Sequence, residues 1–318
     1  MGLLGVQKAI LSQFPYPARD FLQINITIFN KKLTNFTFLC YTDFIQGDKQ
    51  MKTPNEKEFI HSIVKSSVIA YAEGFECRHV GEYDNPEGTI NMKIHNVFIE
   101  ALGKEIQYYT ALSRSLDSSL GNMLEKMAIT LAEQNYIVKR DVEGPLYDGQ
   151  TQLIATILEQ YKRHNKKPEI KDYSNMLDIN NGTESHVRHD SDYYLYDKDT
   201  DKHYLIELKI GGDLDNKKAR AEKEAILEQY AILSNIVGDT SKIKIYFATA
   251  YNRYGENKPW KQERVKQFFG TDELLIGKEF WNFICKSENG YKYVLESYRE
   301  NAHYIKEALD RIKGKYLG

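Results

Sequence analysis

The sequence predicts an α/β fold in which helices flank a mixed central β-sheet. Two observations lead to this prediction. A hairpin of two apolar strands is followed by the order helix, strand, helix, and a strongly amphipathic helix precedes the hairpin. Elements in this order pack as helical layers on a sheet. The residues before the amphipathic helix show strand and helix patterns of their own, which adds an N-terminal α+β extension to the expected fold.

The N-terminal extension begins with a strand-like stretch. Residues 20–45 are rich in Ile, Phe and Thr, and the alternation of apolar and polar residues there predicts strand. Residues 55–73 have apolar residues at helical spacing, and the turn-rich stretch 81–88 predicts a loop. We expect residues 1–110 to form this first region and to serve DNA binding or dimerisation.

A second region, residues 111–318, is expected to start with the amphipathic helix at 113–135. Leucines and methionines recur there at three- and four-residue spacing, and small residues form an edge beside them. Glu125 falls on this edge, so we expect its carboxylate to approach the sheet closely. The small residues are Gly121, Ala128 and Ala132.

The expected sheet is built from residues after this helix. Residues 192–196 and 204–209 predict two strands joined by the polar turn 197–202. A further buried strand is expected at residues 243–249. Helices are predicted at residues 151–161 and 217–234, and a closing helix is marked by apolar residues from Leu295 to Ile312.

Composition excludes several classes of protein. The net charge of -2 argues against a wholly basic, histone-like protein, and no run of about 18 apolar residues predicts a membrane span. The three cysteines are scattered and lack a C-x-x-C spacing, so we expect neither a disulfide framework nor a zinc site. Because the first residues also lack a signal-peptide pattern, the expected compartment is the cytoplasm.

The candidate catalytic residues lie on the predicted hairpin. Side chains alternate along a strand, so Glu207 and Lys209 share one face. Asp192 opens the partner strand, and a short hairpin brings its carboxylate beside that of Glu207. Two adjacent carboxylates repel each other unless a cation lies between them. Mg²⁺ is the expected cofactor, because it binds one or two carboxylates together with substrate phosphate.

These groups suit the hydrolysis of a phosphodiester. A metal held by Asp192 and Glu207 polarises the phosphate and activates a bound water. Lys209 is expected to stabilise the developing charge or to orient that water. Glu125 is the expected further ligand, for a second metal or for a metal-bound water. Asp190 is the alternative to Asp192 and is less favoured, because Asp192 borders the strand directly.

Other polar residues near the hairpin have a structural interpretation. Asp213 and Asp215 follow Lys209 and are expected to cap the next helix, with a supporting role at the site as the alternative. Three histidines in this part of the chain lack the regular spacing of zinc ligands, so we expect them to be solvated or to support the site. They are His186, His189 and His203.

Asp192, followed after fifteen positions by Glu207-x-Lys209 at the end of an apolar strand, resembles the PD-(D/E)xK nuclease signature. The upstream helix that carries Glu125 resembles the first core helix of that superfamily, which often supplies an acidic residue. Ser191 stands where the superfamily usually has proline. The resemblance implies a restriction-endonuclease-like core that cleaves DNA with Mg²⁺.

Four further stretches resemble type II restriction endonucleases of the TdeIII kind, over roughly residues 110–290. This resemblance implies site-specific cleavage of both DNA strands and a DNA methyltransferase in the same restriction-modification system. The recognition sequences of that family, of the GGNCC type, are not carried over to this chain. The four stretches are Leu120 to Glu125, Ile206 to Lys209, Tyr251 to Gly255 and Leu275 to Trp281.

Basic residues gather late in the chain. Between Lys242 and Phe268 lie seven basic and only two acidic residues, and such an excess predicts contacts with DNA phosphates. Asn252 and Arg253 are the candidates for reading base edges. Lys217 and Arg220 are further DNA-binding candidates, although the acids interleaved with them favour an ordinary helix face.

The sequence therefore predicts a type II restriction endonuclease in a prokaryotic cytoplasm. Because both strands of a two-fold symmetric site are cut, a homodimer is expected. The alternatives are another nuclease of the same fold, acting in repair or on mobile elements, and a nucleic-acid-binding module that lost catalysis. A neighbouring methyltransferase gene would separate the first two hypotheses. The intact Asp192, Glu207 and Lys209 argue against the third.

Overall fold

The computed structural model describes residues 55–318, which belong to one compact unit running from Pro54 to Gly318. The expected strands at residues 20–45 lie outside the described residues. Within the described part, no helix is long and apolar enough to cross a membrane.

A mixed five-stranded sheet lies at the centre of this unit, with its strands in the order β1-β2-β3-β4-β5. The pairs β1–β2 and β2–β3 are antiparallel, whereas β3–β4 and β4–β5 are parallel. This confirms the predicted fold class. The strands are β1 (Ile137–Tyr147), β2 (Glu184–Asp197), β3 (Lys202–Leu208), β4 (Ile243–Thr249) and β5 (Leu274–Ile276).

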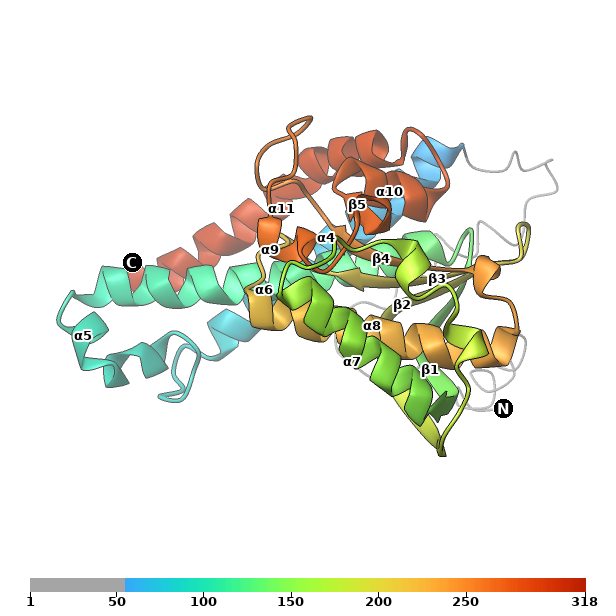
Figure 1. The fold of residues 1–318 in the computed structure, drawn as a ribbon. Helices are drawn as coiled ribbons and strands as arrows, with labels where there is room; N and C mark the ends of the chain where they lie inside the picture. Colours follow the sequence, from blue (N-terminus) through green and yellow to red (C-terminus); the bar gives the residue numbers. More distant parts are fainter. Residues whose placement is uncertain (1–54) are drawn as a thin grey trace, which may run out of the picture. The chain divides into compact units, whose positions relative to one another are not determined.

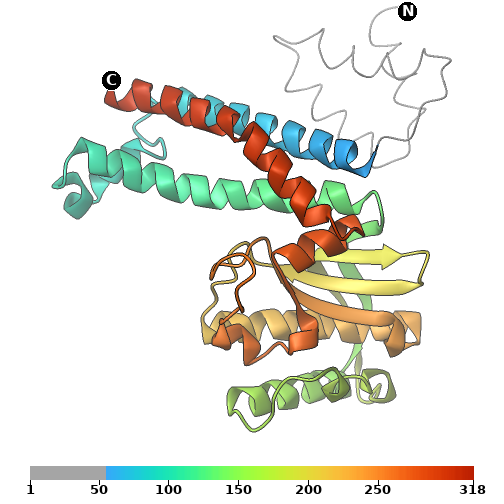
Figure 2. The ribbon, with the colours of Figure 1, turned by 90° about the horizontal axis from the view of Figure 1, so that it is seen from above.

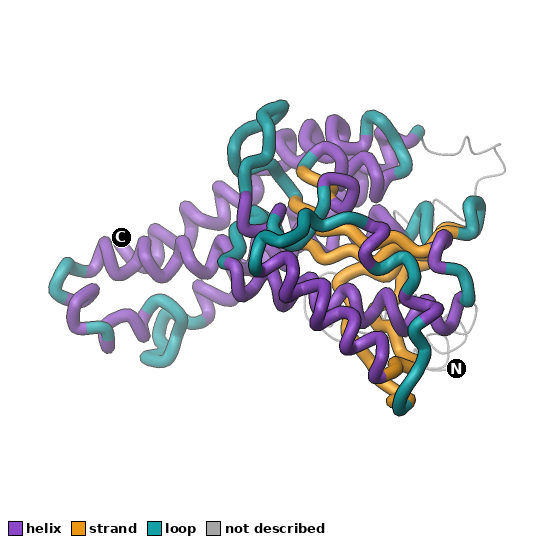
Figure 3. The backbone as a smooth tube through the Cα atoms, viewed as in Figure 1, coloured by secondary structure: helices purple, strands orange, loops and turns teal. Residues whose placement is uncertain are grey.

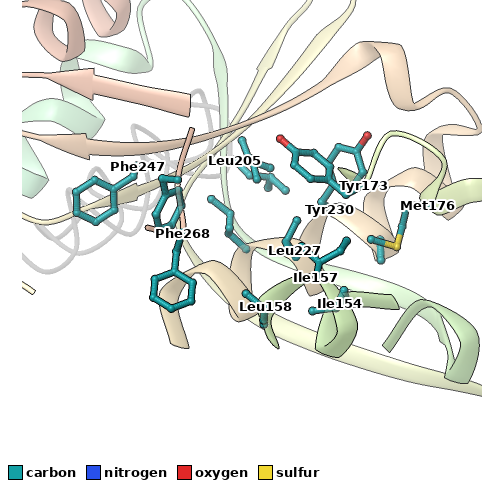
Figure 4. Close-up of a cluster of buried hydrophobic side chains, with 14 of the residues drawn as sticks. Ile154, Ile157, Leu158, Tyr173, Met176, Leu205, Leu227, Tyr230, Phe247 and Phe268 are labelled. Carbon is teal, nitrogen blue, oxygen red and sulfur yellow. The ribbon is translucent and has the colours of Figure 1, made fainter. Parts of the chain in front are cut away.

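One face of the sheet is covered by α8 (Asn216–Val237), and α7 (Asp148–Lys162) packs on α8 (Figure 2). Apolar side chains from both helices meet Leu205 and Phe247 of the sheet in one buried cluster (Figure 4). Asp215 caps the start of α8 by accepting from the Lys218 backbone N–H at 2.8 Å, and Gly238 ends the helix in a left-handed conformation with φ 71°. The predicted capping role of Asp215 is therefore confirmed.

The opposite face carries a second layer of helices (Figures 1 and 2). This layer consists of four helices. Apolar side chains from all four form a buried cluster with Ile206 and Leu208 of β3. Ile206 and Leu208 thus point away from α8, as the strand alternation predicts. The helices are α4 (Glu56–Gly81), α6 (Lys104–Ala132), α10 (Lys278–Cys285) and α11 (Gly290–Leu317).

Three of these helices extend beyond the sheet as an arm. The C-terminal halves of α4 and α11 run beside the N-terminal half of α6 (Figure 2). A separate buried cluster that includes Phe75, Tyr108 and Tyr316 holds them together. The tip of the arm is made by a short 3-10 helix, η1 (Asn91–His95), and α5 (Val97–Glu100), which lie at its far end (Figure 3).

Most predicted elements match the described ones. The strand at residues 243–249 coincides with β4, and the expected helices correspond to α4, α6, α7, α8 and α11, all longer than predicted. Strand β2 begins at Glu184, so the prediction that Asp192 opens this strand is wrong, and Asp192 lies inside it. Strands β1 and β5 have no counterpart among the predictions, because β1 is mostly polar and β5 has only three residues. The expected division between residues 110 and 111 falls inside α6, and the compact unit from Pro54 to Gly318 continues across it.

Candidate active site

An irregularity in β2 shapes the centre of the candidate site. Lys139 of β1 pairs with Tyr194, and Asp141 pairs with Asp190. Three residues of β2, from Ser191 to Tyr193, therefore stand opposite the single residue Arg140. Such bulges bend a strand and redirect its side chains, and they are common beside active sites.

The bulge places Asp192 beside β3, the strand that carries Glu207 and leads to Lys209. The last paired residues of β2 and β3 are Tyr193 and Ile206, so one further step in the same register sets Asp192 opposite Glu207. Asp192 Oδ2 also accepts a hydrogen bond from the Leu208 backbone N–H at 3.1 Å. This bond ties the Asp192 carboxylate to the end of β3, next to Glu207.

Glu207 is held in an environment that disfavours its negative charge. Its side chain is only 13 % exposed. Burial and the nearby Asp192 raise the pKa of Glu207 to about 8, although Lys209 partly offsets this. The positive charge near Asp192 and Glu207 is therefore too small to balance the negative charges of the two carboxylates.

Lys209 supplies part of the missing positive charge. Its Nζ donates to Glu207 Oε1 at 2.5 Å and lies 3.2 Å from Glu222 Oε1 on α8. Burial lowers the pKa of Lys209, but the surrounding carboxylates outweigh this and raise it above its ordinary value. Sequence reasoning missed Glu222, since nothing in the spacing of α8 shows which of its acids faces β3.

Glu125 lies on α6, which packs on the face of the sheet opposite to α8, and it approaches Asp192 from there. The Tyr193 hydroxyl donates to the Glu125 carbonyl at 2.9 Å. Burial and the nearby Asp192 raise the pKa of the Glu125 carboxyl. Gly121 lies close to Ile210, because a Cβ there would lie 3.4 Å from Ile210 Cγ1. The small-residue edge thus brings α6 up to the end of β3.

A cleft of about 300 Å³ opens between α6 and the bulge, and Glu125 and Asp192 both line it. Arg140 lines it too and donates from Nη1 to the Asp192 carbonyl at 3.1 Å. Asp190, the alternative to Asp192, also borders the cleft, but its side chain is exposed. Sequence reasoning missed Arg140 because it lies on β1, the strand that was not predicted.

The donors present fit a hard divalent cation. Among residues 55–318, no group of three or more His, Cys, Asp or Glu side chains is arranged to hold a metal. Mg²⁺ does not require such a group, since one or two carboxylates with waters and substrate phosphate suffice. The charge-deficient pair of Asp192 and Glu207 provides two carboxylates of this kind.

The predicted DNA-binding residues lie in different surroundings. Arg253 Nη1 pairs with Asp213 Oδ2 at 2.7 Å, so Asp213 is an ion-pair partner and not a helix cap. Asn252 uses both ends of its amide inside its own loop, donating to the Lys258 carbonyl and accepting from the Tyr254 N–H. On α8, Arg220 lies 3.6 Å from Glu159, and Lys217 is exposed.

The three histidines near the hairpin are engaged separately. His186 contacts Glu143 at 3.0 Å, His189 contacts Glu228 at 3.2 Å, and the His203 ring lies 2.9 Å from the Tyr194 hydroxyl. The three rings therefore have three different partners, and none of these partners is shared.

Comparison with models of protein families matches residues 55–302 to the family of the type II restriction endonuclease HinfI. The chain belongs to this family. The HinfI family match confirms the restriction endonuclease predicted from the PD-(D/E)xK signature, while the likeness to TdeIII stays a prediction. The match also begins well before residue 110, so α4, η1, α5 and the first half of α6 belong to the HinfI-like part of the chain, whereas α11 continues beyond its end. Comparisons with curated proteins and with solved structures found no match.

Proposed function

We propose that this HinfI-family protein hydrolyses phosphodiester bonds of double-stranded DNA at specific sites in a Mg²⁺-dependent reaction, with Asp192 and Glu207 as the metal-binding carboxylates. One observation carries the proposal. The β2 bulge sets Asp192 opposite buried Glu207, and the mutual repulsion of the two groups favours binding of a cation between them.

Each residue then has a separate task. Asp192 and Glu207 would hold Mg²⁺, which would polarise the phosphate and lower the pKa of a water molecule. Lys209 keeps its proton, because the carboxylates around it raise its pKa, and so offers a fixed positive charge to the transition state. Glu125 lines a cleft together with Asp192, and there it orients water or a further metal ligand.

Arg140 is the phosphate-binding group that the cleft adds to the predicted set. Its guanidinium uses one N–H for the Asp192 carbonyl, and no ion pair within 4 Å engages it among the described residues. An arginine with free donors suits bidentate binding of a phosphate. It lines the cleft together with Asp192, so a phosphate that it binds would lie next to one of the two carboxylates.

The remaining parts of the proposal concern partners and location. We propose a homodimer, since two strands must be cut and each chain brings one such pair of carboxylates. A DNA methyltransferase of the same restriction-modification system would protect the host DNA. A prokaryotic cytoplasm is the expected location, in agreement with the scattered cysteines.

Digestion of a plasmid of known sequence, with and without Mg²⁺ and followed by mapping of the ends, tests the proposal. We expect discrete fragments with Mg²⁺ and none in excess EDTA. Glu207→Gln should abolish cutting, and Glu143→Gln, which changes an exposed acid on β1, should cut normally. Cutting in EDTA would contradict the metal mechanism. Random cleavage would favour a repair-type nuclease over a restriction enzyme.

A further inference from the structure

The tip of the arm exposes a large apolar surface. Phe98 is 82 % exposed and Val97 65 %, although side chains of this kind are usually buried. We define the tip patch as the exposed apolar residues of the segment that runs from η1 through α5 to the first turns of α6. They are Met92, Ile94, Val97, Phe98, Leu102, Ile106 and Tyr109.

The tip patch is larger than monomeric proteins usually leave in water. Its seven side chains are between 39 % and 82 % exposed. Taking about 200 Å² for each large side chain, they offer roughly 800 Å² of apolar surface. The largest patch on a typical monomer measures about 300–600 Å², and one side of a standard protein interface about 800 Å². The patch therefore has the size of one half of a stable dimer contact.

The charge of the tip argues against DNA as the group that covers it. From Asn91 to Tyr109, two lysines are balanced by two glutamates, Glu100 and Glu105. DNA binding draws its affinity from an excess of Lys and Arg, and the tip has none. An apolar surface without net charge is best covered by another apolar surface.

We propose that the tip patch is the contact through which two copies of this chain form a dimer. In a two-fold contact, the same patch on both chains must be self-complementary, and a neutral apolar patch meets this condition without placing like charges together. The inference rests on the proposed function in one respect: two strands are cut and each chain provides one candidate site, so two copies must act together.

The mass of the full chain in solution tests this proposal. Light scattering after size-exclusion chromatography at micromolar concentration should give twice the chain mass of 37.0 kDa. Phe98→Glu, and the double variant Phe98→Glu with Leu102→Glu, should give one chain mass, because charge in an apolar contact is costly. Ser118→Glu puts the same charge on an exposed position of α6 outside the patch and should remain dimeric.

Two further measurements keep the outcomes distinct. Circular dichroism should show an unchanged fold in the Phe98 variants, because Phe98 packs little against its own chain. Glu207→Gln should stay dimeric, so loss of cutting with the dimer intact would count against the proposed function alone. The proposal would be wrong if the wild-type chain were a monomer, or if both Phe98 variants were still dimers. The tip patch would then have to be covered by residues 1–54 or by another protein.

Discussion

The sequence predicts functional residues both on the β2–β3 pair and in the loop around Arg253. The two regions differ in how far their charged and polar groups already have partners within the protein. At the strand pair, Glu207 is buried with too little positive charge, and burial raises its pKa to about 8. In the loop, Arg253 is paired with Asp213, and Asn252 bonds the backbone of its own turn. A buried negative charge with too little positive charge around it favours the binding of a cation. Polar groups that already have partners within their own loop mainly stabilise the conformation of that loop.

The sharpest way to test this contrast is removal of the Lys209 charge. Lys209→Ala should lower the rate of DNA cleavage by about 100-fold or more, since groups acting on transition-state charge have effects of this size. Single-turnover cleavage assays measure it. Lys306→Ala removes an exposed lysine of α11 and should change nothing. Cleavage within a few-fold of wild type would take Lys209 out of the mechanism.

Metal binding tests the unmet charge without any cleavage. Ca²⁺ or Mg²⁺ at 100 times its dissociation constant should stabilise the fold by about 2.7 kcal/mol, because it binds the folded chain only. Thermal unfolding should show this as a rise of several degrees, at about 2–4 °C per kcal/mol. Glu207→Gln should abolish the rise. An equal rise in that variant would place the cation elsewhere.

Glu125 should matter less than the strand pair. Glu125→Gln keeps the shape of the side chain and removes a charge at the edge of the cleft, so we expect a loss of about tenfold in rate, or about 1.4 kcal/mol. Glu133→Gln changes an exposed glutamate just after α6 and serves as the control. If the two variants have equal activity, Glu125 belongs to the helix surface.

The loop should give the smallest effect. An exposed ion pair is worth about 0–1 kcal/mol, so DNA can compete with Asp213 for Arg253. Arg253→Ala should weaken DNA binding and reduce the salt slope by about one unit, and Asp213→Ala should strengthen binding. Binding isotherms over a salt series measure both effects. Unchanged isotherms for both variants would show that this loop does not face DNA.

How much the sequence could predict depended on whether each feature is local. Strand alternation separated Glu207 from Ile206 and Leu208, and the small residues of α6 brought Glu125 to the sheet, because both patterns repeat within one element. Arg140 and Glu222 were missed because their roles depend on which strand or helix lies beside them. The β2 bulge was missed for the same reason: it exists only in the register between β1 and β2.

Helix α6 connects the tip of the arm to the cleft without a break. Twenty-one residues separate Lys104, where α6 begins, from Glu125, which corresponds to about 32 Å of helix at about 1.5 Å per residue. If two chains meet at their tips, the two α6 helices lead from the shared contact to the two proposed sites. Together they span about 63 Å, compared with about 34 Å for one turn of DNA. The angle between the two helices would then set how far apart the two strands are cut.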